Sequence, residues 1–102
     1  MTPTALTLVT IVAEKVLEAK LERLLLGAGA SGFTATDARG QGSRHTGSST
    51  FEGQNVRIET VVSAEVARRI VDQIADLYFP HYGVIAFTSE VAVVRGEKYV
   101  GT

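Results

Sequence analysis

The sequence predicts a single α+β domain of the ferredoxin-like βαββαβ type. Three observations lead to this class. Segments rich in β-branched residues and two amphipathic segments follow one another in the order strand, helix, strand, strand, helix, strand. Each crossover through a helix should be right-handed, which places both helices on one face of the sheet. The length of 102 residues suits one domain with one core.

The first strand is predicted over residues 5–12, where β-branched side chains are frequent and both faces are apolar, as in a strand covered on each side. A helix is predicted from about Ala13 to Leu26, because apolar residues recur there every three or four positions and charged residues fill the other face. The apolar positions are Leu17, Leu21, Leu24 and Leu25. The sequence GAGASG at residues 27–32 ends this helix, since glycine readily adopts the left-handed cap conformation.

Two more strands are predicted at residues 32–39 and 56–62. Side chains of the later strand alternate between an apolar face and a mixed face. The first face carries Val56, Ile58, Thr60 and Val62, and the second carries Arg57, Glu59 and Val61.

The second helix is predicted to begin after Ser63, whose side-chain oxygen can accept a hydrogen bond from a free N–H group of the first turn. Its buried stripe is expected to consist of Val66, Ala67, Ile70, Val71, Ile74 and Leu77. Pro80 and Gly83 end the helix. Residues 84–87 and 91–95 supply the last strand, either as one strand broken near Thr88 or as a small hairpin.

The face of the sheet opposite the helices is expected to be apolar and uncovered within one chain, because two helices form only one layer. Other copies of the chain are expected to cover it. The sequence therefore predicts a closed homo-oligomer.

A long polar connection over residues 37–55 joins the second and third strands. Connections longer than about 12 to 15 residues usually bind a partner or are disordered. Only Ala38 and Phe51 are clearly apolar in this one, and its arginines, histidine and hydroxyl groups could contact a ligand or partner. The connection is therefore predicted to carry the function and to become ordered only when it is bound.

Composition excludes several classes of function. The formal net charge of -1 gives no overall field to attract nucleic acid or an acidic membrane surface. With no cysteine, the chain has no disulfide, thiol nucleophile or zinc-thiolate site, which is consistent with a reducing compartment. The first residues lack a basic region and reach Glu14 and Lys15 too early for a signal peptide. We expect a cytoplasmic protein without a nucleic-acid partner.

No set of catalytic residues is evident. The sequence has no G-x-S-x-G motif and no P-loop, and neither His45 nor His81 has an evident carboxylate partner. We expect a protein that is not an enzyme and has no metal site. The alternative from another class is a small hydrolase or diphosphatase acting on ATP, which would need a base and a metal ligand.

Three stretches resemble the PII signalling superfamily: GFTATDARGQGSRHTG at residues 32–47, the following VRIETVVSAEVARRIVDQI, and the terminal HYGVIAFTSEVAVVRGEKYV. In that family a Gly-x-Gly opens a long T-loop, a glycine before the last strands forms the B-loop, and an Arg-x-Arg-Thr-Gly-Glu type sequence closes the chain. Gly40 and Gly42 match the T-loop base, Gly83 matches the B-loop, and Arg95-Gly96-Glu97 matches the end. The resemblance implies one PII-like domain over residues 1–102 with a T-loop at about residues 40–55.

Two departures point away from the nitrogen sensors of the superfamily. Val84 replaces the lysine that follows the B-loop glycine, and the loop lacks the tyrosine that those proteins modify. The sequence is more similar to the PII-like SbtB branch. That resemblance implies a homotrimer that binds adenyl nucleotides (cAMP, AMP, ADP and ATP) between subunits and regulates the membrane bicarbonate transporter SbtA. It implies no cofactor, although Mg²⁺ or Ca²⁺ could accompany ATP. A nitrogen-type regulator remains an alternative.

The nucleotide contacts implied by the resemblance come from the strand entering the loop, the loop base, the B-loop with the last strand, and the end of that strand. They are Thr34, Thr36, Asp37, Gly40, Gln41, Gly42, Ser43, Arg44, Gly83, Val84, Ile85, Ala86, Phe87 and Arg95. The transporter is expected to contact Arg44, His45, Thr46, Ser48, Ser49 and Phe51.

Two features of the loop base suit a phosphate group. Because Gly40 and Gly42 have no Cβ, the backbone can approach a ligand closely and direct N–H groups at an anion. The position of this motif between a strand and a loop excludes a Rossmann fingerprint. Arg44 offers five N–H donors in a planar fork that fits phosphate oxygens.

Plainer interpretations stay open for several of these residues. Ile85 and Phe87 could belong to the core, and Arg95 could form a structural ion pair with Glu97 or Glu90. Ordinary polar positions on a solvent-exposed strand face would equally explain Thr34, Thr36 and Asp37. Arg44 could be a solvated loop arginine that binds no nucleotide.

Overall fold

The computed structural model describes residues 2–40 and 54–99. It contains a four-stranded sheet, two α-helices and two short 3₁₀ turns. In chain order the elements are β1 (Thr4–Glu14), η1 (Lys15–Leu17), α1 (Glu18–Ala28), β2 (Thr34–Ala38), β3 (Asn55–Val62), α2 (Ala64–Leu77), β4 (Ile85–Val93) and η3 (Gly96–Tyr99).

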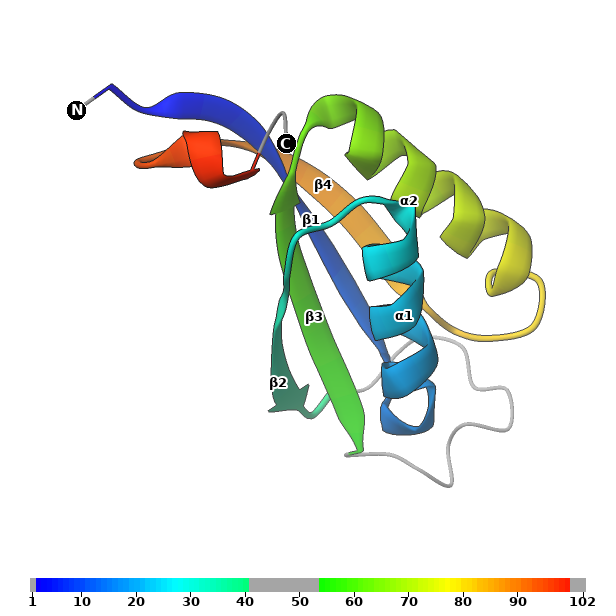
Figure 1. Cartoon of the computed structure of the whole chain (residues 1–102). Helices are drawn as coiled ribbons and strands as arrows, with labels where there is room; N and C mark the ends of the chain where they lie inside the picture. Colours follow the sequence, from blue (N-terminus) through cyan, green and yellow to red (C-terminus); the bar gives the residue numbers. More distant parts are fainter. Residues whose placement is uncertain (1, 41–53, 100–102) are drawn as a thin grey trace.

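The sheet has the strand order β2-β3-β1-β4, and all neighbouring pairs are antiparallel. Both helices lie side by side on the same face of this sheet (Figure 1). This arrangement is the ferredoxin-like βαββαβ fold that the sequence predicts.

The core lies between the helices and one face of the sheet. Alternate residues of β1 and β3 point into it, and the strand contributions are Val9, Ile11, Ala13, Val56, Ile58 and Val62. The first helix contributes Leu21 and Leu25, with Leu17 from η1. The alternation predicted for β3 is confirmed, because Val56, Ile58, Thr60 and Val62 are all buried on the helix side.

The first helix begins later than the sequence predicts. β1 continues through Ala13 and Glu14, which pair with Val56 and Asn55 of β3, and α1 starts only at Glu18 after the turn η1. Pairing with a distant strand thus overrides the helical spacing of apolar residues at this point. The glycine-rich stretch ends the helix as predicted, but two residues later than Leu26: Gly27 and Ala28 are still helical, and Gly29 follows with a φ of 120°.

The buried stripe of α2 is narrower than expected. Ala67, Ile70 and Ile74 are buried, and Val66 and Val71 are half-buried. Leu77 was predicted in the stripe, but 59% of its surface is exposed. It is the last residue of the helix, directly before the C-cap Tyr78.

The last strand is one uninterrupted element, so the hairpin alternative is wrong. Thr88 and Ser89, where a break was considered, pair with Val9 and Leu8 of β1. The second strand is shorter than predicted and begins at Thr34.

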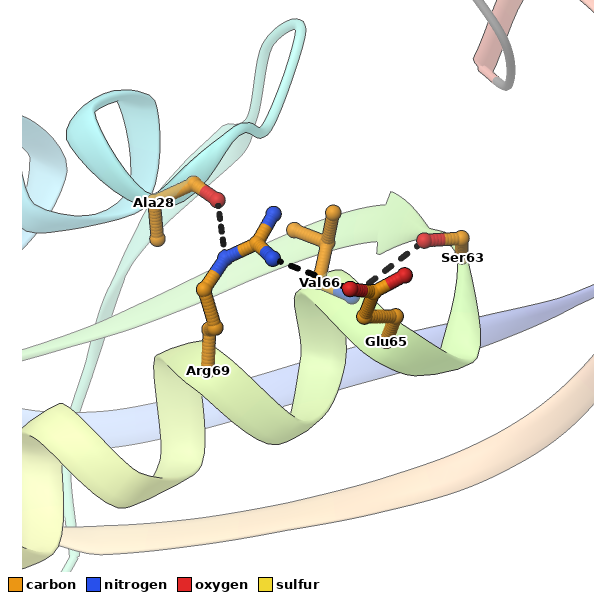
Figure 2. Close-up of polar contacts among 5 residues, drawn as sticks. All are labelled: Ala28, Ser63, Glu65, Val66 and Arg69. Carbon is orange, nitrogen blue, oxygen red and sulfur yellow. Dashed lines mark hydrogen bonds and ion pairs between the residues drawn. The ribbon is translucent and has the colours of Figure 1, made fainter.

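Polar contacts join the C-terminal end of α1 to the first turns of α2 (Figure 2). The Ser63 Oγ accepts the Val66 N–H at 3.2 Å, which confirms the predicted N-cap. Arg69 donates from Nε to the Ala28 carbonyl at 3.1 Å, and its guanidinium also lies 3.4 Å from a Glu65 carboxylate oxygen. A free carbonyl at the end of α1 is thereby satisfied, so Arg69 has a structural role.

Gly96 is buried against the first residue of β1. A Cβ at this position would lie 2.3 Å from the Thr4 Cβ, whereas a Cβ on Gly27 of α1 would meet nothing within 4 Å. We expect Gly96→Ala to displace η3 from β1 and lower the free energy of unfolding by about 1 to 3 kcal/mol. Gly27→Ala should instead raise it by about 0.5 to 1 kcal/mol, because alanine is the better helix former. Urea unfolding of both variants measures the difference, and equal effects would contradict the close approach.

Candidate functional site

The strand register places two groups of candidate residues at the same end of the sheet. Thr36 of β2 lies opposite Arg57 of β3, Arg57 lies opposite Val12 of β1, and Val12 lies opposite Ile85 of β4. A single row across the sheet therefore runs from one candidate group to the other. We call this the loop end of the sheet, because the connection between β2 and β3 starts and finishes there.

The first candidate group lies on edge strand β2. Thr34 and Thr36 are exposed on the face away from the helices, and Asp37 is exposed on the helix side. Gly40 follows, and a Cβ there would meet no described atom within 4 Å. The absence of a side chain at Gly40 is thus not required by packing within the described part of the chain, which leaves room for an external group to approach its backbone.

The second group lies at the start of the opposite edge strand, β4. Ile85 is 54% exposed and Phe87 is 46% exposed, so the core interpretation of these two residues is wrong. Val84 and Ala86 point the other way and pack against the core. The structure therefore divides this predicted set, leaving Ile85 and Phe87 as the side chains that a ligand or another copy could contact.

One chain does not bring the two groups together. Neighbouring strands lie about 4.8 Å apart, so β2 and β4, with β3 and β1 between them, are separated by about 14 Å. Figure 1 shows the two strands at opposite edges of the sheet. Each group is thus half of a site at most.

Arg95 lies far from both groups. It follows the other end of β4, and the strand from Ile85 to Val93 spans about 27 Å at about 3.4 Å per residue. Its φ is 67°, a left-handed conformation that a non-glycine residue seldom adopts. Among the described residues it makes no ion pair with Glu90 or Glu97.

Lys15, which the sequence analysis did not single out, connects the β2 group to the start of α1. Its ammonium pairs with the Asp37 carboxylate and lies 3.5 Å from a Glu18 carboxylate oxygen. The hydrogen bond that the Lys15 ammonium donates to the Asp37 carboxylate is the main cause that raises the pKa of Lys15 above its usual value. Lys15 also lines a pocket of about 260 Å³ with Glu14, Val16 and Gln54. Asp37 is 22 residues away in the chain, so no local spacing could indicate this contact.

The face of the sheet opposite the helices carries many apolar side chains and, besides Thr34 and Thr36 at the β2 edge, a polar cluster. Its exposed or half-buried apolar side chains are Leu8, Val12, Val61, Ile85, Phe87, Val91 and Val93. In the cluster, the Thr10 hydroxyl donates to Glu59 at 3.0 Å and Arg57 donates to the same carboxylate oxygen at 3.2 Å. We call this surface the open face.

Several predicted residues lie outside the described part of the chain. They are the loop-base residues Gln41, Gly42, Ser43 and Arg44 and the partner-contact residues His45, Thr46, Ser48, Ser49 and Phe51.

His81 is described and exposed, and the centre of its ring lies 6.5 Å from that of Tyr82. Within residues 2–40 and 54–99, no three His, Asp or Glu side chains gather in a way that could hold a metal ion. None of the helices in those residues is long and apolar enough to cross a membrane.

The structure is thus that of a small ferredoxin-like α+β protein with two separated groups of candidate residues at one end of its sheet. The nitrogen regulatory protein P-II family matches residues 6–98 of this chain. The chain belongs to that family of signalling proteins.

A solved structure from Thermus thermophilus, described as a PII-like signalling protein, is 55% identical to the chain. The match covers 98% of this chain and 100% of the other, with a TM-score of 0.85. CPII of Thiomonas intermedia, a nitrogen regulatory PII-like protein, was solved with ADP and bicarbonate bound. It is 21% identical with a TM-score of 0.82, over 96% of this chain and 97% of its own, and another CPII structure contains ADP, AMP and bicarbonate. At this identity, CPII shows a shared fold.

Proposed function

We propose that the protein is a PII-like signalling protein that binds adenyl nucleotides in clefts between three identical subunits. One observation supports this proposal above all: the candidate groups on β2 and β4 lie at the same end of the sheet but about 14 Å apart, at opposite edges. A second copy can supply the half that one chain lacks. In a closed ring, each subunit offers its β2 edge to one neighbour and its β4 edge to the other.

The open face supplies the reason for such a ring. Ile85 and Phe87 are about half exposed in one chain, although each is a large apolar side chain. Covering the open face with other copies removes this apolar surface from water and stabilises the assembly. The trimer expected from the SbtB resemblance would bury the face around its axis.

The two half-sites offer complementary chemistry to an adenyl nucleotide. The exposed Ile85 and Phe87 side chains suit the flat, largely apolar base, and the hydroxyls of Thr34 and Thr36 can hydrogen-bond a ribose or a base edge. Arg44 would bind the phosphates. The related fold of CPII, solved with ADP and AMP, adds support for this class of ligand. Arg95 could contact the phosphates only if another copy brought its end of β4 to the cleft.

The segment between Gly40 and Asn55 would report the bound nucleotide to a partner. Following the SbtB resemblance, we propose that this partner is the membrane bicarbonate transporter SbtA, and that the cytoplasmic protein is recruited to the inner membrane through it. The proposed contacts are Arg44, His45, Thr46, Ser48, Ser49 and Phe51. The proposed signal is a change in the balance between two states of this loop, one that binds the partner and one that does not. A nucleotide can shift that balance only by its differential affinity for the two states, typically about 1 to 3 kcal/mol.

Isothermal titration calorimetry with cAMP, AMP, ADP and ATP, the last with and without Mg²⁺, tests ligand binding directly. At least one nucleotide should bind. Arg44→Ala should weaken the tightest of them about tenfold or more, because hydrogen bonds to a charged phosphate are worth about 1.5 to 3 kcal/mol. Arg68→Ala is the control, since Arg68 is exposed on α2 and outside both half-sites. Absence of heat from all four nucleotides would refute the proposal.

A further inference from the structure

Lys15 contacts both ends of the connection between β2 and β3. Its ammonium bonds Asp37, the second-to-last residue of β2, and its backbone N–H donates to the Gln54 carbonyl just before β3, at 2.9 Å. Because Lys15 is the first residue of η1, it joins both strand ends to the start of α1. Figure 1 shows these three places at the same end of the sheet.

The charges around Lys15 favour this arrangement. Two carboxylates, from Asp37 on β2 and Glu18 on α1, share the single ammonium group. A lysine side chain is charged at neutral pH, and the contact with Asp37 raises the pKa of Lys15 further. The Glu18 side chain is 27% exposed and that of Asp37 is 78% exposed. Glu18, the less exposed of the two, therefore fixes the ammonium beside α1, and the ammonium in turn holds the Asp37 carboxylate, most of which is in water.

The position of this ion pair matters more than its strength. An exposed ion pair adds only about 0 to 1 kcal/mol to the stability of a whole protein. However, β2 has only five residues and, within the described part of the chain, pairs with β3 alone. Its ladder ends at Ala38 opposite Asn55, one residue beyond Asp37. Among residues 2–40 and 54–99, the end of such a short edge strand has few other contacts to hold it, so a modest interaction can determine how often it opens.

We propose that Lys15 is a positioning residue that fixes the paired ends of β2 and β3 and thereby sets the geometry of the β2 half-site. Loss of the Asp37 contact frees the end of β2, while the backbone bond to Gln54 still holds the start of β3. This positioning role can be tested without any ligand. Its consequence for nucleotide binding rests on the proposed function.

Amide hydrogen exchange, measured by NMR without nucleotide, tests the positioning role. In Lys15→Met, those amides of residues 36–38 and 55–57 that bond across the β2–β3 pair should exchange about two- to fivefold faster, the factor that loss of an exposed ion pair allows. Residues 60–62, at the far end of β3, should keep their exchange rates. Lys20→Met is the matched control: Lys20 is exposed on α1 and forms no ion pair with another described residue.

Rescue and ligand affinity separate positioning from a general loss of structure. Lys15→Arg should restore the exchange rates, and Asp37→Asn should accelerate exchange without adding to Lys15→Met in the double variant. For a nucleotide that binds the wild type, Lys15→Met should lower the affinity about two- to fivefold. Unchanged exchange in Lys15→Met, or equal acceleration in Lys20→Met, would overturn the inference. Failure of the wild type to bind any nucleotide would refute the proposed function alone, because the exchange result needs no ligand.

Discussion

Phe87→Glu is expected to convert the assembly into single chains. Phe87 lies on the open face and is 46% exposed in one chain, so a glutamate there can remain in water as long as the chain is alone. Between subunits, the same carboxylate would lose its hydration without gaining a partner, at a cost of several kcal/mol per ion. Size-exclusion chromatography with light scattering at micromolar concentration should show three chains for the wild type and one for the variant.

The neighbouring residue supplies the control for this experiment. Thr88 is exposed on the same strand but points to the opposite face, where the helices lie. Thr88→Glu introduces the same charge one residue further along the strand and should leave the mass of the assembly in solution unchanged. Circular dichroism should show that both variants are folded. A single-chain mass for the wild type would contradict the proposed ring, and an intact assembly in Phe87→Glu would move the subunit contact away from the open face.

Local patterns in the sequence were sufficient to predict the class of fold. The alternation of Val56, Ile58, Thr60 and Val62 fixes which face of β3 is buried, and Ser63 marks the start of α2 through a hydrogen bond within one turn. Each of these signals depends on residues that are close in the chain. Errors arose where a distant partner decides the outcome, as at Ala13 and Glu14, which remain in β1 because β3 pairs with them.

The candidate site was less accessible to prediction for the same reason. The sequence indicated the residue types on β2 and β4, but the strand order that places those strands at opposite edges depends on long-range pairing. Periodicity also could not tell which of the residues 84–87 face outward. The structure selects Ile85 and Phe87, because the odd-numbered positions of β4 share the open face. The contact between Lys15 and Asp37 has no local signature at all.

Replacement of Ile74 by alanine is expected to have the largest effect on stability among the changes considered. Ile74 is fully buried between α2 and the sheet, with 0% of its surface exposed. Removing three carbon atoms from such a position loses their transfer free energy and leaves a cavity, which together cost about 2 to 5 kcal/mol. The small gain in helix propensity on changing isoleucine to alanine cannot offset this loss. Urea unfolding at fixed protein concentration measures the difference, because subunit association also contributes to stability.

Leu77→Ala on the same helix is the matched comparison. Sequence periodicity assigns Leu77 and Ile74 to one buried stripe, whereas the structure leaves Leu77 59% exposed. Removal of a half-exposed side chain should cost less than about 1 kcal/mol, because little apolar surface is returned to water. Similar losses for the two variants would mean that Leu77 is buried in the working assembly, and the subunit contact would then have to include the end of α2 as well as the open face.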